Sequence, residues 1–178
     1  MSQIGQTSLQ LRQALRRLAK AVAVITTQFD GRRFAMSATA VSELSMDPPS
    51  MLICVNQTAA LHEPLRSGAD FCINILHSSQ KDISVGCGGQ LQGEARFSRG
   101  EWFETALGIP CLRDAQASII CRNQTRLAYG THSIFIGNVE RLIVSGETDP
   151  LIYVDGQYTA AESMRNERST HQSIATAG

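Results

Sequence analysis

Residues 118–144 read SIICRNQTRLAYGTHSIFIGNVERLIV. Two runs rich in β-branched and aromatic residues, 118–129 and 133–144, lie on either side of the pair Tyr129-Gly130. Runs of this composition are typical of β-strands, and a glycine between them is typical of a turn. The stretch therefore predicts two long strands joined by a tight turn.

Shorter strand patterns precede and follow this stretch. We expect these strands at residues 21–27, 32–40, 51–56, 70–76 and 151–154. The pair Asp30-Gly31 predicts a hairpin turn between the first two of them. Long alternating strands with few helices favour a closed antiparallel barrel. The expected fold is therefore mainly β, a β-barrel with peripheral helices.

Three helices are expected at the periphery. The first is capped by Thr7 or Ser8, and its apolar residues follow helical spacing, so that one face should pack on the domain. These apolar residues are Leu11, Ala14, Leu15, Leu18 and Val22. Two shorter helices are expected at 58–67, with Thr58 as its cap, and at 78–85.

Length and composition indicate one globular domain. The chain has 178 residues, of which 43% are hydrophobic and 18% charged, enough to build a substantial core. We expect this domain to span residues 1–158, with a polar, flexible or partner-bound tail at 159–178. Sixteen basic residues balance sixteen acidic ones, so the overall charge favours neither nucleic acid nor an anionic membrane as the main partner.

The start of the chain and its cysteines indicate a cytoplasmic protein. The N-terminus lacks the charged start and apolar core of a secretory signal, and no apolar run approaches the roughly 20 residues that span a bilayer. The five cysteines are odd in number and form no Cys-x-x-Cys pair, which argues against a disulfide framework and against a thiolate metal site.

Most familiar enzyme motifs are missing from the sequence. The cluster Gly86 to Gly89 lacks the Gly-x-Gly-x-x-Gly spacing of a Rossmann fold and follows a helical segment. The sequence also contains no Walker loop, no His-Glu-x-x-His and no Gly-x-Ser-x-Gly. Any nicotinamide must therefore bind in another way.

Residues 36–56, MSATAVSELSMDPPSMLICVN, have the composition of a ligand-binding loop. Small residues let the backbone approach a flat ligand, and their hydroxyl and amide groups can bond to a ring edge or a phosphate. The same hydroxyl groups would also suit the polar face of an alternating strand. The segment alone does not decide between these two interpretations.

Several motifs taken together resemble the short flavin reductases of two-component monooxygenase systems. The resemblance runs from Leu9 to Tyr158, in order and with compatible spacing. Its motifs are residues 36–56, Asn56-Gln-Thr-Ala-Ala-Leu61, Phe71-Cys-Ile-Asn-Ile-Leu76 with Ser78-Ser-Gln80, Arg96-Phe97, Gly130-Thr-His-Ser133 and Tyr153. An ordered set of this kind is far more specific than any single motif.

The resemblance implies a split-barrel, FMN-binding-like fold, a homodimer and the reduction of a flavin by a nicotinamide. The flavin would be FAD or FMN, and NADH is expected rather than NADPH because no basic cluster is assignable to a 2′-phosphate. Reduced flavin would then pass to a separate monooxygenase. The alternatives are a flavin store or sensor without reductase activity and, as the least expected, a barrel without ligand.

The resemblance also assigns residues to the site. It places Met36, Ser37, Ala38 and Thr39 along the isoalloxazine ring, and Ser45, Asn56, Gln57 and Thr58 at the ribityl chain or phosphates. It places Asn74, Leu76, Ser79, Gln80, Arg96 and Phe97 at the outer part of the flavin, and His132, the expected catalytic residue, with Tyr153 near the nicotinamide. It implies no metal ligand.

Simpler interpretations exist for several of these residues. Asn56 to Thr58 would also suit a turn and helix cap, and a buried Asn74 would be satisfied by backbone groups. Arg96 could be a solvated charge, Phe97 a core residue and His132 a surface turn residue. Thr131 replaces the aspartate that usually precedes the family histidine, which removes a carboxylate that would orient His132.

Overall fold

The structure, a computed structural model, describes residues 3–162. Most of the expected polar tail lies outside the described residues. The helices are α1 (Gln3–Leu15), α2 (His62–Arg66), α3 (Lys81–Val85), and the short turns η1 (Ser78–Gln80), η2 (Gly86–Gln90) and η3 (Gly93–Phe97). The helix expected at 78–85 is therefore present as η1 followed by α3.

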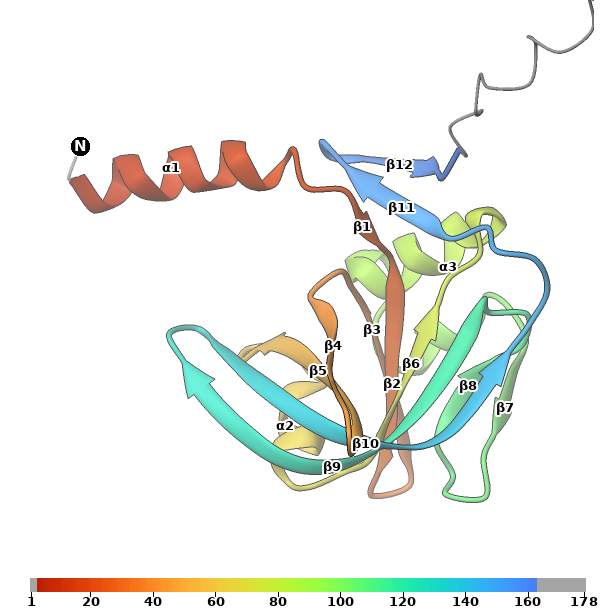
Figure 1. The fold of residues 1–178 in the computed structure, drawn as a ribbon. Helices are drawn as coiled ribbons and strands as arrows, with labels where there is room; N and C mark the ends of the chain where they lie inside the picture. Colours follow the sequence, from red (N-terminus) through yellow and green to blue (C-terminus); the bar gives the residue numbers. More distant parts are fainter. Residues whose placement is uncertain (1–2, 163–178) are drawn as a thin grey trace, which may run out of the picture.

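One large antiparallel sheet dominates the described chain (Figure 1). Its strand order is β3-β2-β6-β9-β10-β5-β4. The strands are β2 (Ala23–Phe29), β3 (Arg32–Ala38), β4 (Val41–Met46), β5 (Pro49–Asn56), β6 (Phe71–Ile75), β9 (Ala117–Tyr129) and β10 (His132–Val144). The long hairpin predicted from residues 118–144 is confirmed as β9 and β10, and the mainly β class is confirmed with it.

The two edge strands of this sheet, β3 and β4, follow one another in the chain. Only Thr39 and Ala40 separate them, so the sheet must curl until its edges meet at this corner. No ladder pairs β3 with β4 within residues 3–162, and Ala40 instead accepts a hydrogen bond from the backbone of Cys54 on β5. The expected closure of the barrel by a continuous ladder is therefore not made, and the sheet stays split at this corner.

Two small sheets complete the architecture. β1 (Lys20–Ala21), β11 (Leu151–Val154) and β12 (Gln157–Ala160) form one, and β7 (Trp102–Glu104) pairs with β8 (Pro110–Leu112) in the other. The limits of β11 match the expectation, whereas β7, β8 and β12 were not predicted because strands this short carry little alternation. No helix among residues 3–162 has the length and apolar character to cross a membrane.

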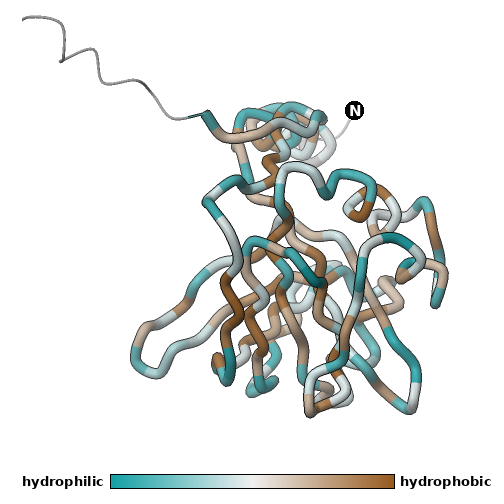
Figure 2. Tube along the Cα trace, turned by 90° about the vertical axis from the view of Figure 1, so that its right-hand side faces the viewer, coloured by the Kyte–Doolittle hydropathy of each residue, from teal (hydrophilic) through white to brown (hydrophobic). Residues whose placement is uncertain are grey.

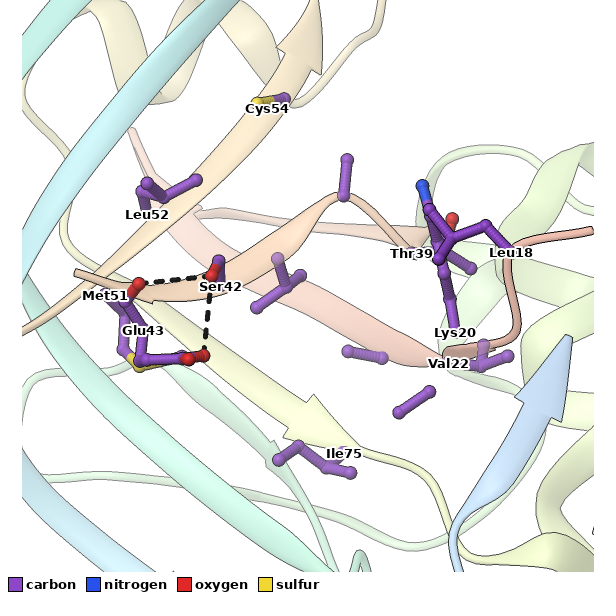
Figure 3. Close-up of a pocket in the computed structure, with 14 residues that line it drawn as sticks. Leu18, Lys20, Val22, Thr39, Ser42, Glu43, Met51, Leu52, Cys54 and Ile75 are labelled. Atoms are coloured by element: carbon purple, nitrogen blue, oxygen red, sulfur yellow. Dashed lines mark hydrogen bonds between the residues drawn. The ribbon is translucent and has the colours of Figure 1, made fainter. Parts of the chain in front are cut away.

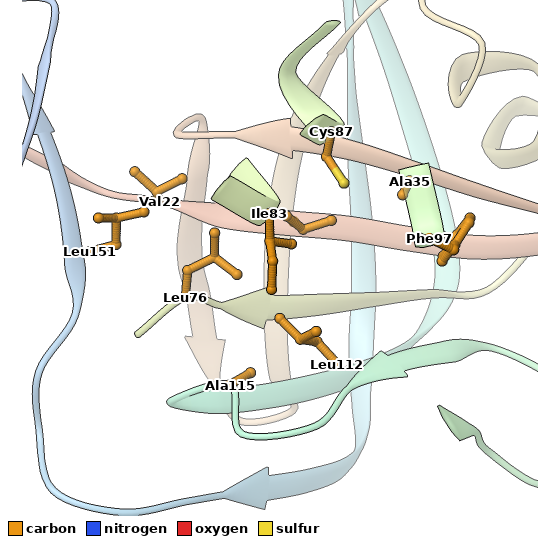
Figure 4. Packing of buried hydrophobic residues seen from close by; sticks show 10 residues of the cluster. Val22, Ala35, Leu76, Ile83, Cys87, Phe97, Leu112, Ala115 and Leu151 are labelled. Atoms are coloured by element: carbon orange, nitrogen blue, oxygen red, sulfur yellow. The ribbon is translucent and has the colours of Figure 1, made fainter. Parts of the chain in front are cut away.

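The two larger core clusters lie on the two faces of β2. Side chains of a strand alternate between faces, so Ala23 and Ile25 join the cluster inside the curled sheet, while Val22 and Val24 join the cluster beneath α3 and η2. Figure 4 shows the second cluster. In Figure 2 the brown segments gather in the central strands and the teal ones at the loops, as expected of such a core.

The expected packing of the first helix is wrong. α1 projects from the body of the molecule (Figure 1), and Leu11, Leu15 and Leu18 are 57%, 48% and 52% exposed. The helix ends at Leu15, so the apolar spacing that seemed to continue to Val22 crosses a helix end, and Val22 belongs to the core instead. Arg16 ties this end to the β11–β12 turn through an ion pair with Asp155.

Two further expectations need correction. The segment 36–56 is not a loop, because β3, β4 and β5 together account for most of it. The helix expected from Thr58 starts only at His62, with Leu61 as its N-terminal cap residue, because the first residues form a turn around the side chain of Asn56. The expected cap at Thr58 is therefore not formed.

A close approach between strands requires a glycine at position 137. A Cβ atom there would lie 2.7 Å from Cβ of Cys121 and 2.7 Å from Cζ of Phe71, both of which are fully buried. Gly137→Ala is expected to lower the free energy of unfolding by about 1–3 kcal/mol through overpacking. Urea unfolding measures this loss.

Phe71→Leu provides the control for this prediction. The smaller side chain frees the space beside position 137, so the double variant should lose less stability than the sum of the two single losses. Additive losses would show that the contact with Phe71 does not cause the destabilisation.

Candidate active site along strand β3

Three cavities lie along β3 and the corner that follows it. We call them the arginine cavity, the hydroxyl cavity and the apolar cavity, with volumes of about 530, 210 and 450 Å³. Ala35 and Gly89 line the arginine cavity, while Ser37 and Gly88 line the hydroxyl cavity, so the two follow one another along the strand. The hydroxyl and apolar cavities share Val22 and Thr39. All three cavities thus lie beside β3 or the corner after it, and the hydroxyl and apolar cavities adjoin.

A chain of hydroxyl groups defines the hydroxyl cavity. Ser84 Oγ lies 2.8 Å from Ser37 Oγ and 3.0 Å from the Tyr158 hydroxyl, so it links β3 to β12. Ser84 is fully buried at the centre of this chain. The ring of Tyr153 meets that of Tyr158 edge-on at 5.1 Å between centroids. The cavity therefore offers aromatic walls and ordered hydroxyl groups, which suit the polar edge of a flat ring.

The glycines of η2 bring the backbone close to this cavity. A Cβ atom at Gly88 would lie 3.7 Å from Cβ of Ser37, so the two segments nearly touch. Burial raises the pKa of the neighbouring Cys87 thiol to about 11. This thiol is therefore protonated near neutral pH and offers no thiolate nucleophile.

The apolar cavity lies on the other side of Thr39 (Figure 3). Its walls come from the segment before β2, the β3–β4 corner, β5 and the end of β6. They include Leu18, Val22, Thr39, Val41, Met51 and Ile75. Ser42 contributes a hydroxyl group that donates to the carbonyl oxygen of Glu43 at 3.1 Å. A mostly apolar space with a few polar groups at its edge suits a second flat ring.

The arginine cavity lies at the start of β3. Arg33 forms an ion pair with Glu94, and its guanidinium stands 4.4 Å from the centre of the Phe97 ring. The hydrogen bond that Arg33 donates to Glu94 raises the pKa of the guanidinium. Arg96 donates to the carbonyl oxygens of Leu91, at 2.9 Å, and Ala35. The cavity therefore carries fixed positive charge.

A second group of predicted site residues lies apart from these cavities, at the turn between β9 and β10. His132 pairs with Asn56 across the two strands, and Gln57 donates to the carbonyl oxygen of His132 at 3.2 Å. Asn56 accepts hydrogen bonds from the backbone and hydroxyl groups of Thr58, both at 2.9 Å. None of these four residues lines the three cavities.

Other predicted site residues satisfy their polar groups locally. Ser45 closes the turn at Asp47, accepting from its backbone N–H at 3.1 Å and donating to its carbonyl oxygen at 2.9 Å. Gln80 accepts from the backbone of His77 at 2.9 Å and donates to Asp114 at 3.2 Å. Ser79 bonds to the His77 ring at 2.9 Å. Ser79 and Gln80 line a separate polar cavity.

Asn74 lies in the core with its side chain fully bonded. Its amide donates to the carbonyl oxygen of Val24 at 3.0 Å and to the Thr26 hydroxyl at 3.1 Å. Its oxygen accepts from the Leu112 backbone at 2.8 Å and from the Ser118 hydroxyl at 3.0 Å. Leu76 and Phe97 are also core residues, and Met36 packs against the other core cluster. These contacts support a structural role for all four predicted residues.

The structure therefore brings together part of the predicted set. Ser37, Ala38, Thr39 and Tyr153 line the hydroxyl cavity, and Arg96 lines the arginine cavity. Sequence reasoning missed Ser84 and Tyr158, which complete the hydroxyl chain. Ser84 carried a signal, since it is a hydroxyl residue beside the buried Ile83 on a short helix, whereas Tyr158 follows a turn and carried none.

Within residues 3–162 no group of three or more His, Cys, Asp or Glu is placed to hold a metal ion.

Comparison with known proteins identifies the family that the chain resembles. The family described as "Flavin reductase like domain" matches residues 15–162. The reductase component of the FADH(2)-dependent resorcinol hydroxylase of Rhizobium sp. is 41% identical over 160 residues, 89% of this chain and 88% of that protein. The FMN reductase (NADH) RutF of Methylorubrum populi is 35% identical over 83% of this chain and 73% of its own length.

A solved structure agrees with these relatives. BorF, the flavin reductase component of a bacterial two-component tryptophan halogenase, superposes with a TM-score of 0.80 at 29% identity. The match covers 88% of this chain and 99% of that one. The sheet and the elements around the cavities are therefore those of a flavin reductase of the split-barrel type.

Asn74→Ala tests the structural role of this residue. The substitution leaves buried donors and acceptors on several strands without partners, so the free energy of unfolding should fall by about 3 kcal/mol or more. Chemical unfolding measures the loss, and flavin affinity of the folded fraction should stay near wild type.

Ser37→Ala is the matched comparison, because it removes a hydroxyl group that faces the cavity. This variant should weaken flavin binding with a smaller loss of stability. A selective loss of flavin affinity in Asn74→Ala, without loss of stability, would restore Asn74 as a ligand-binding residue.

Proposed function

The chain belongs to the flavin reductase like family, and we propose that it is an NADH-dependent flavin reductase that supplies reduced flavin to a separate monooxygenase. The observation that carries this proposal is the meeting of two cavities at Thr39. Two flat rings can meet there and stack face to face. Hydride transfer between a nicotinamide and a flavin requires that arrangement.

The reaction moves one hydride from C4 of NADH to N5 of the oxidised flavin, giving NAD⁺ and an anionic reduced flavin. The reacting atoms must approach to about 3–3.5 Å, so the task of the protein is positioning. We place the isoalloxazine ring against Ser37 and Thr39, where hydroxyl and backbone N–H groups can bond to its polar edge. Such donors also favour the negative charge that the ring gains. The nicotinamide enters from the apolar cavity.

The site fits a flavin that is bound and released as a substrate. The cavities lie beside a strand, and their lining combines hydroxyl groups with apolar and aromatic side chains. The relative named as a reductase component is part of a two-component system with a hydroxylase. We infer by similarity that the reduced flavin made here is used by a partner monooxygenase.

We further propose that the protein acts as a homodimer. The leucines of α1 are exposed, and Leu18 forms the rim of the apolar cavity. A second copy packed on α1 would bury these leucines and cover the apolar cavity. It would also explain why His132 lies away from the cavities of its own chain, since the β9–β10 turn of a neighbour can approach them.

A cytoplasmic location is part of the same proposal. All five cysteines are free thiols, although the sulfur atoms of Cys72 and Cys111 lie only 3.5 Å apart in the core. Thiols this close stay reduced most readily in a reducing compartment.

The first test follows NADH oxidation by absorbance in the presence of added FAD or FMN. We expect turnover with wild-type protein, and Thr39→Ala should raise the flavin KM about five- to tenfold, the effect of one lost hydrogen bond. Thr125→Ala, an exposed threonine on β9, is the matched control and should behave as wild type. Flavin that binds without NADH oxidation would instead identify a flavin store or sensor.

A second test concerns His132 and the dimer. His132→Ala should raise the nicotinamide KM or lower kcat more than it weakens flavin binding. Leu15→Asp should convert the dimer to a monomer in sedimentation measurements and cause the same kinetic loss, because His132 acts across the interface. Wild-type kinetics for His132→Ala would remove this residue from the site, and a monomeric wild-type protein would refute the dimer.

A further inference from the structure

The middle hydroxyl group of the hydroxyl chain, that of Ser84, has two partners and no contact with solvent. Ser84 is fully buried, and its Oγ lies 2.8 Å from Ser37 Oγ and 3.0 Å from the Tyr158 hydroxyl. Among residues 3–162 these are the only side-chain hydrogen bonds of Ser84. All three residues line the hydroxyl cavity.

The hydroxyl chain must run in one direction at a time, because each hydroxyl group has a single proton to donate. In one direction Tyr158 donates to Ser84 and Ser84 to Ser37, so the Ser37 proton is left for an acceptor in the cavity. In the other direction Ser37 donates to Ser84 and Ser84 to Tyr158, so Ser37 is left to accept. Both directions fit the observed distances. Rotation of three hydroxyl groups therefore reverses the chain without moving a heavy atom.

A flavin ring needs both directions, since reduction changes the hydrogen bond that its N5 atom can form. N5 of the oxidised ring carries a lone pair and no proton, so it accepts a hydrogen bond. N5 of the reduced ring carries the transferred hydrogen, so it donates one. A neighbour that could only donate or only accept would favour one redox state, whereas a reversible hydroxyl group serves both.

We propose that Ser84 and Tyr158 are positioning residues that let Ser37 donate to the oxidised flavin and accept from the reduced flavin. This inference rests on the proposed function for the position of the ring against Ser37. Ser84 acts on the flavin through Ser37, because Ser84 itself is fully buried. Tyr158 supplies the second partner that Ser84 needs in either direction. The chain thereby keeps the affinities for the two redox states close, which suits a flavin that enters oxidised and leaves reduced.

Tyr158→Phe tests the inference with the loss of one oxygen atom. In this variant the Ser84 proton has a partner only when Ser84 donates to Ser37, because the opposite direction leaves a buried donor unpaired. The Kd for reduced FMN should therefore rise about tenfold, while the Kd for oxidised FMN stays within about twofold. The potential of bound FMN should fall by about 30 mV, which equals a tenfold change for a two-electron couple.

Two measurements give both affinities without NADH. Titration of FMN fluorescence gives the Kd of the oxidised form. The potential of bound FMN, measured anaerobically against a redox dye, then gives the Kd of the reduced form through the thermodynamic cycle.

Further variants separate the hydroxyl chain from general packing. Ser84→Ala should lower the potential in the same direction, and Tyr158→Phe added to it should lower it no further, because both substitutions break one chain. Thr159→Val is the matched control, since it removes the exposed hydroxyl group of the next residue on β12, and it should leave both affinities as in wild type.

An unchanged FMN potential in Tyr158→Phe would overturn the inference. Equal losses of affinity for oxidised and reduced FMN would do the same, because they would show a role in shape alone. Additive effects of the two substitutions would contradict a single chain. Failure of the proposed function looks different, because wild-type protein would then bind FMN in both redox states without oxidising NADH.

Discussion

The buried side-chain amide of Asn74 is the interaction on which the arrangement of strands depends. From β6 it bonds to β2 through Val24 and Thr26, to β8 through Leu112 and to β9 through Ser118. A buried amide that makes four such bonds cannot shift its register without leaving several polar groups unpaired. Among the described strands β3 pairs with β2 alone, so the position of the cavities that β3 lines follows from where this amide holds β2.

Strand patterns predicted the sheet well because burial on alternate sides leaves a direct mark in the sequence. The hairpin of β9 and β10 and the limits of β11 are examples. Helical spacing was a poorer guide, since the leucines of α1 indicate an apolar face but not what covers it. Three hydroxyl and amide residues, Ser45, Ser79 and Gln80, matched the family motif although the structure uses their polar atoms in turns and caps. Their residue types cannot distinguish a cap from a ligand contact.

The site itself combines an ordered part and an open part. Ser37, Ser84 and Tyr158 form a connected hydroxyl chain whose centre is buried, so the ring edge meets donors that are already in place. The apolar cavity beside Thr39 is lined mostly by apolar side chains, so it contributes shape complementarity more than hydrogen bonds. This division suits a reaction in which one ring is oriented by fixed donors while the other only has to lie against its face.

The side chains on the two faces of β3 contact different parts of the molecule, so a substitution on one face has little effect on the contacts of the other. Phe34, Met36 and Ala38 pack against the core inside the sheet, although Phe34 and Ala38 also reach the edges of cavities, whereas Ser37 and Thr39 line the hydroxyl cavity from the other face. Substitutions at Ser37 or Thr39 therefore change the hydroxyl cavity while leaving the core inside the sheet intact. Relatives whose names mention FADH(2) and FMN are 41% and 35% identical to this chain, so related chains are associated with both flavins.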